Sequence, residues 1–266
     1  MATAVPVFEE RRMSIGRVFQ RAFAAISLNP FVILSLAFVI GALPGLLMTY
    51  FMYEIGLTNP AVLRSGSISS WGIAAAGFVS SILTFVISSL VQGALTRATV
   101  SANEGERVSF GESLAAALRV LLPLIGLSIL WALGIGFGFI LLVVPGIILL
   151  MMWSVATPAL VVERQGVFAA FSRSAELTKG AKWKVFGLCL LLLVIYWLLS
   201  LIVGLVGLGT FRGSSPEGLT ATNIVGSIIV GTIFNMLWGT IQPSLYVELR
   251  QWKEGDSADS LAEVFA

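Results

Sequence analysis

The sequence predicts an all-α integral membrane protein with six transmembrane helices, built as three parallel repeats, with both termini in the cytoplasm. Three observations lead to this prediction. Hydrophobic residues make up 57% of the 266 residues and charged residues only 11%, whereas an average soluble domain is about 25% charged. The basic residues gather on one side of the predicted helices. A heptapeptide also recurs three times, at 89–95, 154–160 and 239–245, which indicates internal repeats.

Charge-free apolar blocks supply the six crossings. The blocks cover 22–53, 65–96, 120–162, 185–211 and 220–247, and each crossing needs about 20 apolar residues. The third block is long enough for two crossings, with a turn at Val143-Val-Pro-Gly146 in which Pro145 suits the first turn of the second helix.

The distribution of Lys and Arg gives the orientation. Of the 16 basic residues, only Arg64 and Arg212 fall in the loops on one side, and the others flank the spans on the opposite side. The positive-inside rule therefore predicts cytoplasmic termini and short outer loops. The expected location is the bacterial cytoplasmic (inner) membrane, with multiple passes.

Each repeat is predicted to contain an amphipathic interfacial helix followed by a two-helix hairpin. In the first, apolar residues from Ile15 to Ile26 recur at helical spacing and Asn29-Pro30 ends the helix. In the second, Ser109 and Glu112 form a capping box. The predicted repeats cover 13–99, 108–163 and 166–250, and a cytoplasmic tail covers 251–266.

The heptapeptide is interpreted as a construction element that ends each returning helix. It places a polar side chain beside a helix breaker, and proline frees a backbone carbonyl that a neighbouring polar side chain can bond. A ligand site is the less favoured interpretation, because Gln92 lies only about 7.5 Å along the helix from Arg97, far from the midplane. The predicted helix breaks are Pro145, Pro158 and Pro243.

Small and polar residues form an intramembrane polar seam. Such stripes usually allow close helix packing, and the alternative is a lining for a solute or lipid path. Asn235 is the deepest amide. The seam consists of Ser81, Ser88, Gln92, Thr157, Asn235 and Gln242.

Residue usage argues against several functional classes. The chain has no histidine and one cysteine, Cys189, so metal sites, disulfides and Ser/His or Cys/His catalysis are not expected. The absence of ionisable residues from the spans argues against ion-coupled transport. We expect no enzyme activity, no cofactor and no nucleic-acid partner.

Three segments carry a resemblance to a known group of proteins: Val144-Pro-Gly-Ile-Ile, Pro158–Glu163, and Phe168–Gly180 followed by Trp183–Gly187. There the chain resembles the six-helix membrane domain fused to some bacterial glycerophosphodiester phosphodiesterases, and related stand-alone inner-membrane proteins of uncharacterised function. The resemblance implies six helices with amphipathic helices at the inner surface. It implies no catalysis, because the sequence contains no phosphodiesterase domain.

The favoured function is to bind, handle or sense lipid or amphipathic peptide at the cytoplasmic leaflet, where basic amphipathic helices meet anionic headgroups. One alternative is a small-solute channel or transporter along a pseudo-threefold axis lined by the second, fourth and sixth spans. Another is a structural subunit that packs against other membrane proteins. The expected headgroup contacts are Arg17, Arg21, Lys179, Lys182 and Lys184.

Overall fold

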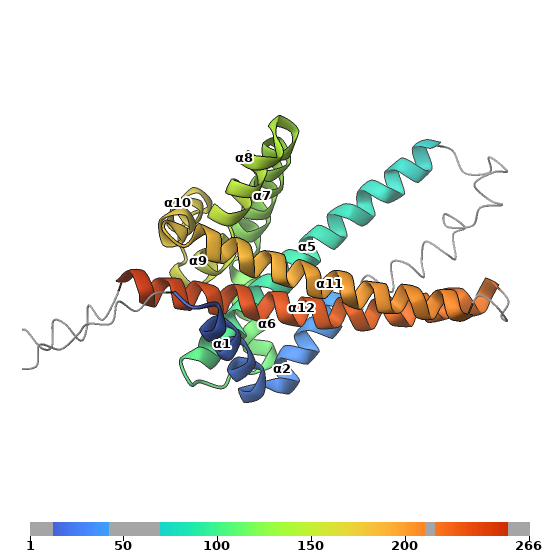
Figure 1. Ribbon diagram of the computed structural model, residues 1–266, viewed down its shortest axis with the longest axis horizontal. Coiled ribbons are helices and arrows are strands. Elements are labelled where there is room, and N and C mark those ends of the chain that lie inside the picture. The colour runs from blue at the N-terminus through green and yellow to red at the C-terminus, as the bar shows by residue number, and fades with distance from the viewer. Residues whose placement is uncertain (1–12, 43–69, 211–215, 255–266) are drawn as a thin grey trace, which may run out of the picture.

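The protein is described here by a computed structural model that covers residues 13–42, 70–210 and 216–254 (Figure 1). Within these ranges every regular element is a helix. The elements are α1 (Ile15–Leu28), α2 (Pro30–Ser35), the π-helical segment η1 (Leu36–Ala42), α5 (Ser70–Asn103), α6 (Phe110–Arg119), α7 (Leu121–Leu141), α8 (Val143–Met152), α9 (Ala156–Glu163), α10 (Val167–Thr178), α11 (Lys182–Thr210) and α12 (Pro216–Glu254).

The helices make this a multi-pass membrane protein. Five segments of the described residues are long and apolar enough to cross a bilayer, and there are six if the bent pair formed by α1 with α2 and η1 counts as one span. The five are Gly77–Asn103, Leu121–Leu141, Val143–Glu163, Lys182–Leu205 and Ile228–Glu254. The outer part of the first predicted span, from residue 43, and Arg64 lie outside the described residues.

The apolar block that begins at Ala22 is bent at Asn29-Pro30, where the sequence predicts the end of the amphipathic helix. Helix α1 ends at Leu28, and the chain bends by 96° before continuing through Val39. Asn29 adopts non-helical angles, and Pro30 occupies the first position of α2, where its missing N–H is harmless. Within this stretch Ala22 and Ala25 are buried and Phe23 is 56% exposed, as expected for an amphipathic helix.

Helix α6 begins with the predicted capping box. Glu112 N donates to Ser109 Oγ at 3.2 Å, and Ser109 N donates to Glu112 Oε2 at 2.7 Å. These bonds satisfy two of the backbone groups left free at a helix terminus. The backbone bond from Ser109 is the largest cause that lowers the pKa of Glu112 below its usual 4.5, followed by the Ser109 hydroxyl and then by the charge of Arg97.

The three helices that follow the amphipathic helices begin with the same burial pattern. The second residues of α2, α7 and α11 are Phe31, Leu122 and Trp183, with exposures of 85%, 82% and 82%. The fourth residues are Ile33, Leu124 and Val185, and all three are buried. Residues eleven positions earlier, in α1, α6 and α10, are buried as well: Ala22, Ser113 and Ser174.

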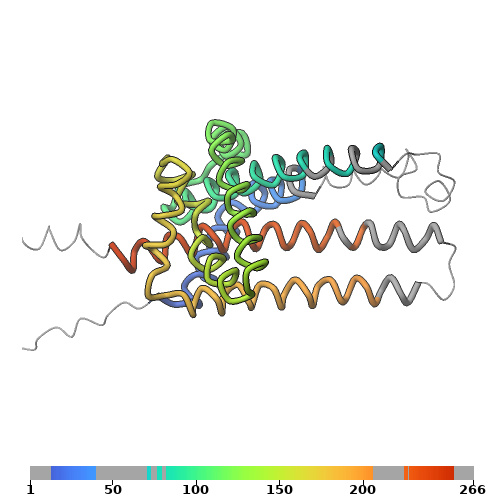
Figure 2. Tube along the Cα trace, turned by 90° about the horizontal axis from the view of Figure 1, so that it is seen from above, coloured from blue at the N-terminus to red at the C-terminus, as the bar shows by residue number. Residues whose placement is uncertain are grey.

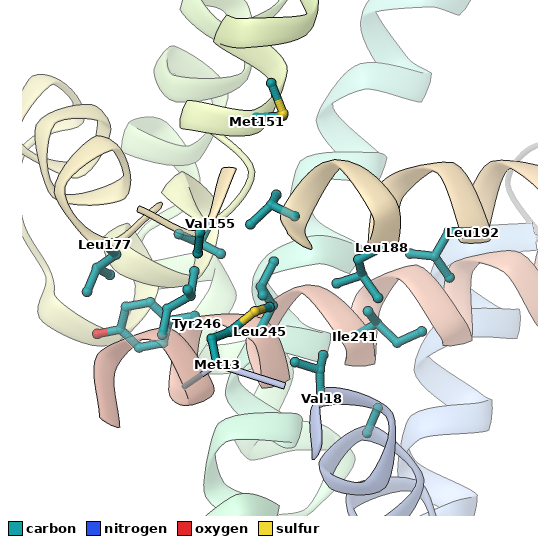
Figure 3. Close-up of a cluster of buried hydrophobic side chains, with 14 of the residues drawn as sticks. Met13, Val18, Met151, Val155, Leu177, Leu188, Leu192, Ile241, Leu245 and Tyr246 are labelled. Carbon is teal, nitrogen blue, oxygen red and sulfur yellow. The ribbon is translucent and has the colours of Figure 1, made fainter. Parts of the chain in front are cut away.

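The core lies at one end of the molecule, which we call the base. It contains α1, α6, α9 and α10 with the adjoining ends of α5, α11 and α12 (Figure 2). A cluster that joins α1, α11 and α12 includes Met13, Val18, Leu188 and Tyr246 (Figure 3). Away from the base, α5, the α7–α8 pair and the α11–α12 pair diverge (Figure 1), so their outer parts present apolar side chains to the surroundings.

The heptapeptide does not end the returning helices, contrary to the prediction. Helix α5 continues from Leu95 to Asn103, and α12 continues through Pro243 to Glu254. A proline is tolerated inside a membrane helix because neighbouring helices can satisfy the freed backbone group. Breaks do occur before the other two predicted prolines: α8 begins two residues before Pro145 and α9 two residues before Pro158.

Candidate functional site

The turn between α10 and α11 carries the lysines that the sequence singled out. Gly180 has φ +90°, a left-handed conformation that glycine adopts without strain. A Cβ built on Gly180 would lie 3.3 Å from the Trp252 ring of α12, so that ring packs on the turn. The ammonium of Lys253 lies 4.9 Å from the centroid of the same ring, which is within cation–π range. Trp252 thus supports the turn and brings a further cation toward it.

Two lysines of this turn have no ion pair within the described part of the chain. Lys179 is exposed and Lys182 is half-buried, and neither forms a salt bridge there. Lys182 and Lys184 occupy the first turn of α11, which contains no acidic residue. The positive end of the helix dipole disfavours cations there and favours an anion. An anionic group would therefore offset a local excess of positive charge.

The exposed ring of Trp183 lies between these cations in sequence. It contacts Phe186 edge-on, with ring centroids 6.2 Å apart. A tryptophan beside lysines at the start of an apolar helix is typical of the boundary between lipid and water. We call Lys179, Lys182, Trp183, Trp252 and Lys253 the basic turn.

The other three predicted headgroup contacts have partners inside the protein. Lys184 Nζ donates to Met13 O at 2.6 Å. Arg17 Nε donates to Glu248 Oε1 at 2.7 Å, and Arg21 Nε donates to Glu248 Oε2 at 3.3 Å. The Glu248 carboxylate is almost fully buried, so it depends on these partners. The two arginines thereby attach α1 to the end of α12.

A second carboxylate, Glu163, connects three helices at the base. Arg173 Nε donates to Glu163 Oε1 at 2.9 Å, and the Tyr246 hydroxyl donates to the same oxygen at 2.7 Å. Arg173 also pairs with Glu254 at the end of α12. Glu163 and Glu248 occupy matching positions three residues after the heptapeptide. Glu163 therefore attaches α9 to α10, and Glu248 attaches α12 to α1.

The polar seam includes one hydrogen bond between helices. Gln242 Nε2 donates to Ser154 O at 2.6 Å. Thr157 and Asn235 are half-buried, and Ser88 is exposed. The side chain of Ser81 lies outside the described residues.

Sequence reasoning missed contacts that only packing reveals. Ser89 Oγ lies 3.2 Å from Ser128 Oγ on α7, and the Ser174 hydroxyl donates to Met152 O at 2.7 Å across the break between α8 and α9. Neither pairing has a local signal in the sequence. Trp252 could have been noticed as an aromatic residue beside a lysine. Among the described residues, no group of three His, Cys, Asp or Glu side chains could hold a metal ion.

Comparison with known proteins yields one informative similarity. The chain is 28% identical over 139 residues to a UPF0259 membrane protein of Pectobacterium carotovorum subsp. carotovorum (strain PC1). The match covers 50% of this chain and 54% of the relative, so it spans about half the length of each. This supports a bacterial membrane protein of uncharacterised function. No protein-family model matches the chain, and no solved structure matches it.

Proposed function

We propose that this chain is a non-enzymatic protein of the bacterial inner membrane that binds anionic lipid headgroups at the cytoplasmic leaflet through the basic turn. The observation that carries the proposal is the pair Lys179 and Lys182, which lack ion pairs within the described residues, beside the exposed Trp183. Each basic residue near an anionic surface contributes about 1 kcal/mol of binding free energy. Arg17 and Arg21 contribute less to this site, because both pair with Glu248.

Three exposed apolar side chains support the position of the membrane surface. Phe31, Leu122 and Trp183 occupy the second position of their helices and are all more than four-fifths exposed. Large apolar side chains in such matching positions would enter the boundary between headgroups and acyl chains. We infer that the lysines of the basic turn lie at the level of the phosphates.

Matching positions also support three related units. The shared burial pattern, the three heptapeptides and the matching Glu163 and Glu248 are what a repeated unit would produce. In each case the returning helix packs on an amphipathic helix: α5 on α6, α9 on α10, and α12 on α1. This order is cyclic, because the last unit packs on the first. We infer a pseudo-threefold arrangement with both termini in the cytoplasm.

The decisive experiment measures lipid preference. The purified protein would be equilibrated in nanodiscs that contain phosphatidylcholine and phosphatidylglycerol, released, and examined by native mass spectrometry for retained lipid. We expect Lys179→Gln combined with Lys182→Gln to reduce the preference for phosphatidylglycerol roughly thirtyfold, since two contacts of about 1 kcal/mol each are lost.

The matched control also removes two positive charges from the side proposed to be cytoplasmic, but away from the basic turn. Arg107 and Arg164 are exposed and form no ion pair among the described residues, so Arg107→Gln combined with Arg164→Gln should leave the preference unchanged. Equal losses in the two double variants would mean that only net charge matters, and the site would be rejected. A retained peptide instead of lipid would also reject it.

A topology measurement tests the proposed orientation. Alkaline phosphatase is active only when it is exported, so a fusion after Arg64 should be active and a fusion at the carboxyl terminus inactive. Activity at the carboxyl terminus would contradict cytoplasmic termini.

A further inference from the structure

The turn of the α7–α8 hairpin consists only of apolar residues. From Ala132 to Met152 the sequence contains no charged side chain and none that ordinarily forms hydrogen bonds. The residues of the turn are strongly exposed, with exposed fractions between 61% and 82%. A turn that reaches water usually carries polar residues, and Trp and Tyr gather where helices leave the bilayer. This turn instead has the surface of a segment that lies among acyl chains. Its residues are Ile140, Leu141, Leu142, Val143 and Val144.

The connection between α11 and α12 provides a contrast. Its sequence contains Arg212, Ser214 and Ser215, which suit a loop in water. Helices α11 and α12 have 29 and 39 residues, so both are longer than the hydrocarbon core of a bilayer, which is about 30 Å thick. These two helices therefore define the direction in which the chain crosses the membrane.

The α7–α8 hairpin runs across this direction. In two views at right angles, α7 and α8 extend from the base across α11 and α12 rather than alongside them (Figure 1 and Figure 2). Helix α7 is long enough to cross a bilayer, but its direction limits the depth that it reaches. Helix α8 has 10 residues, so it is about 15 Å long, half the thickness of the hydrocarbon core. Its continuation, α9, is buried in the base and adds no depth.

The backbone of the turn suits a place without water. Leu142 is the only residue between the two helices. Its N–H donates to Gly138 O at 3.1 Å, and its carbonyl accepts from Gly146 N at 3.5 Å. Pro145 has no N–H, so it removes a donor that the first turn of α8 would otherwise leave free. Because unbonded backbone groups are costly in hydrocarbon, this short bonded turn is favoured there over an open loop.

We propose that this turn is an interaction surface for lipid acyl chains: the α7–α8 hairpin enters the membrane from the base and returns before it reaches the opposite surface. The hairpin takes up area in the leaflet beside the base and leaves the other leaflet free. Both ends of the hairpin remain at the base, so the orientation of the other helices does not depend on it. The basic turn is not involved, so this proposal and the proposed function can fail independently.

Cysteine labelling in sealed membrane vesicles of both orientations tests the depth of the turn. All variants carry Cys189→Ala, so that each has a single thiol. We expect Leu142→Cys to escape a sulfonated, membrane-impermeant maleimide from both sides, and to react once the membrane is dissolved in detergent. Ile140→Cys on the same turn should behave in the same way, which guards against a fault in one variant.

Two control variants show that the reagent reaches each surface. Arg212→Cys, in the connection between α11 and α12, should react from one side only. Glu106 is exposed at the base, so Glu106→Cys should react from the other side only. Labelling of Leu142→Cys from either side would overturn the proposal, because the turn would then lie in water.

A spin label on Leu142→Cys in reconstituted bilayers identifies what surrounds the turn. Molecular oxygen concentrates in hydrocarbon, whereas a water-soluble nickel chelate stays outside it. Contact with acyl chains should therefore give frequent collisions with oxygen and few with nickel. Frequent collisions with nickel would place the turn in water, and few collisions with either would place it beneath other protein, such as a second copy of this chain. Both results would overturn the proposal.

Discussion

Gln242 of α12 donates a hydrogen bond to the backbone oxygen of Ser154, and the N···O distance is 2.6 Å. Ser154 O is the carbonyl that the residue four positions later would bond in an unbroken helix. That residue is Pro158, which has no N–H. The side chain of Gln242 thus satisfies the carbonyl that Pro158 leaves free. This bond joins the third heptapeptide, at 239–245, to the second, at 154–160.

The first prediction concerns this bond. Gln242→Leu should lower the free energy of unfolding by about 1–3 kcal/mol, because it leaves a buried carbonyl without a partner. Chemical unfolding in mild detergent measures the change. In a Pro158→Ala background the backbone N–H is restored, so the same substitution should cost markedly less. Equal costs in both backgrounds would show that the bond does not depend on the proline.

The second prediction concerns the carboxylate that attaches α1 to α12. Glu248→Gln removes a buried charge with two arginine partners, and should destabilise the protein by about 2–4 kcal/mol. That is below the usual upper range for breaking a buried pair, since Arg17 remains partly exposed. Glu254 pairs with Arg173 and Arg250, but its side chain is 36% exposed, so Glu254→Gln should cost only about 0–1 kcal/mol. Similar losses in the two variants would contradict the structural role of Glu248.

The third prediction concerns the α7–α8 hairpin. A Cβ at Gly138 would lie 2.8 Å from Gly146 Cα, and backbone cannot move aside as a flexible side chain can. Gly138→Ala should therefore destabilise the protein by about 1–3 kcal/mol. Gly136 lies on the same helix with nothing within 4 Å of its Cβ position, so Gly136→Ala should cause no loss. Thermal unfolding of the two variants in parallel provides the comparison.

The fourth prediction concerns pH. The pKa of Glu112 is lowered in the folded protein, first by the backbone bond from Ser109. A carboxylate with a lowered pKa stabilises its helix above the usual value of 4.5, and this contribution disappears as pH falls through the lowered value. Hydrogen exchange of α6, corrected for intrinsic rates, should lose protection in that acidic range. Glu112→Gln should remove this pH dependence, and α10, which has no acid in its first turn, should not show it.

The local elements were predictable because their causes are local. The capping box at Ser109 and the end of α1 at Asn29 depend on residues within one turn of each other, and both appear as predicted. The prediction at Pro243 failed because packing decides there. Nothing near Pro243 in sequence indicates that α12 continues through it.

At the candidate site, too, the sequence predicted the residues but not their pairing. The lysine cluster at 179–184 was evident from composition, but pairing across the fold separates its members. Lys184 bonds to Met13 O, 171 residues away, and Arg17 bonds to Glu248, 231 residues away. Several oxygens of α5 and α12 are buried without a hydrogen-bond partner among the described residues. They could not be recognised beforehand, because burial is a property of the packed core.

By itself, the sequence determined that this protein crosses a membrane several times, because hydropathy over about 20 residues depends only on composition. It also determined where the basic residues gather and where the amphipathic helices begin. Only the tertiary structure decided which charges neutralise one another and which lysines remain without ion pairs. It also decided which polar atoms of α5 and α12 are buried. Such pairings join residues far apart in the chain, and their energies depend on distance and burial rather than on sequence order.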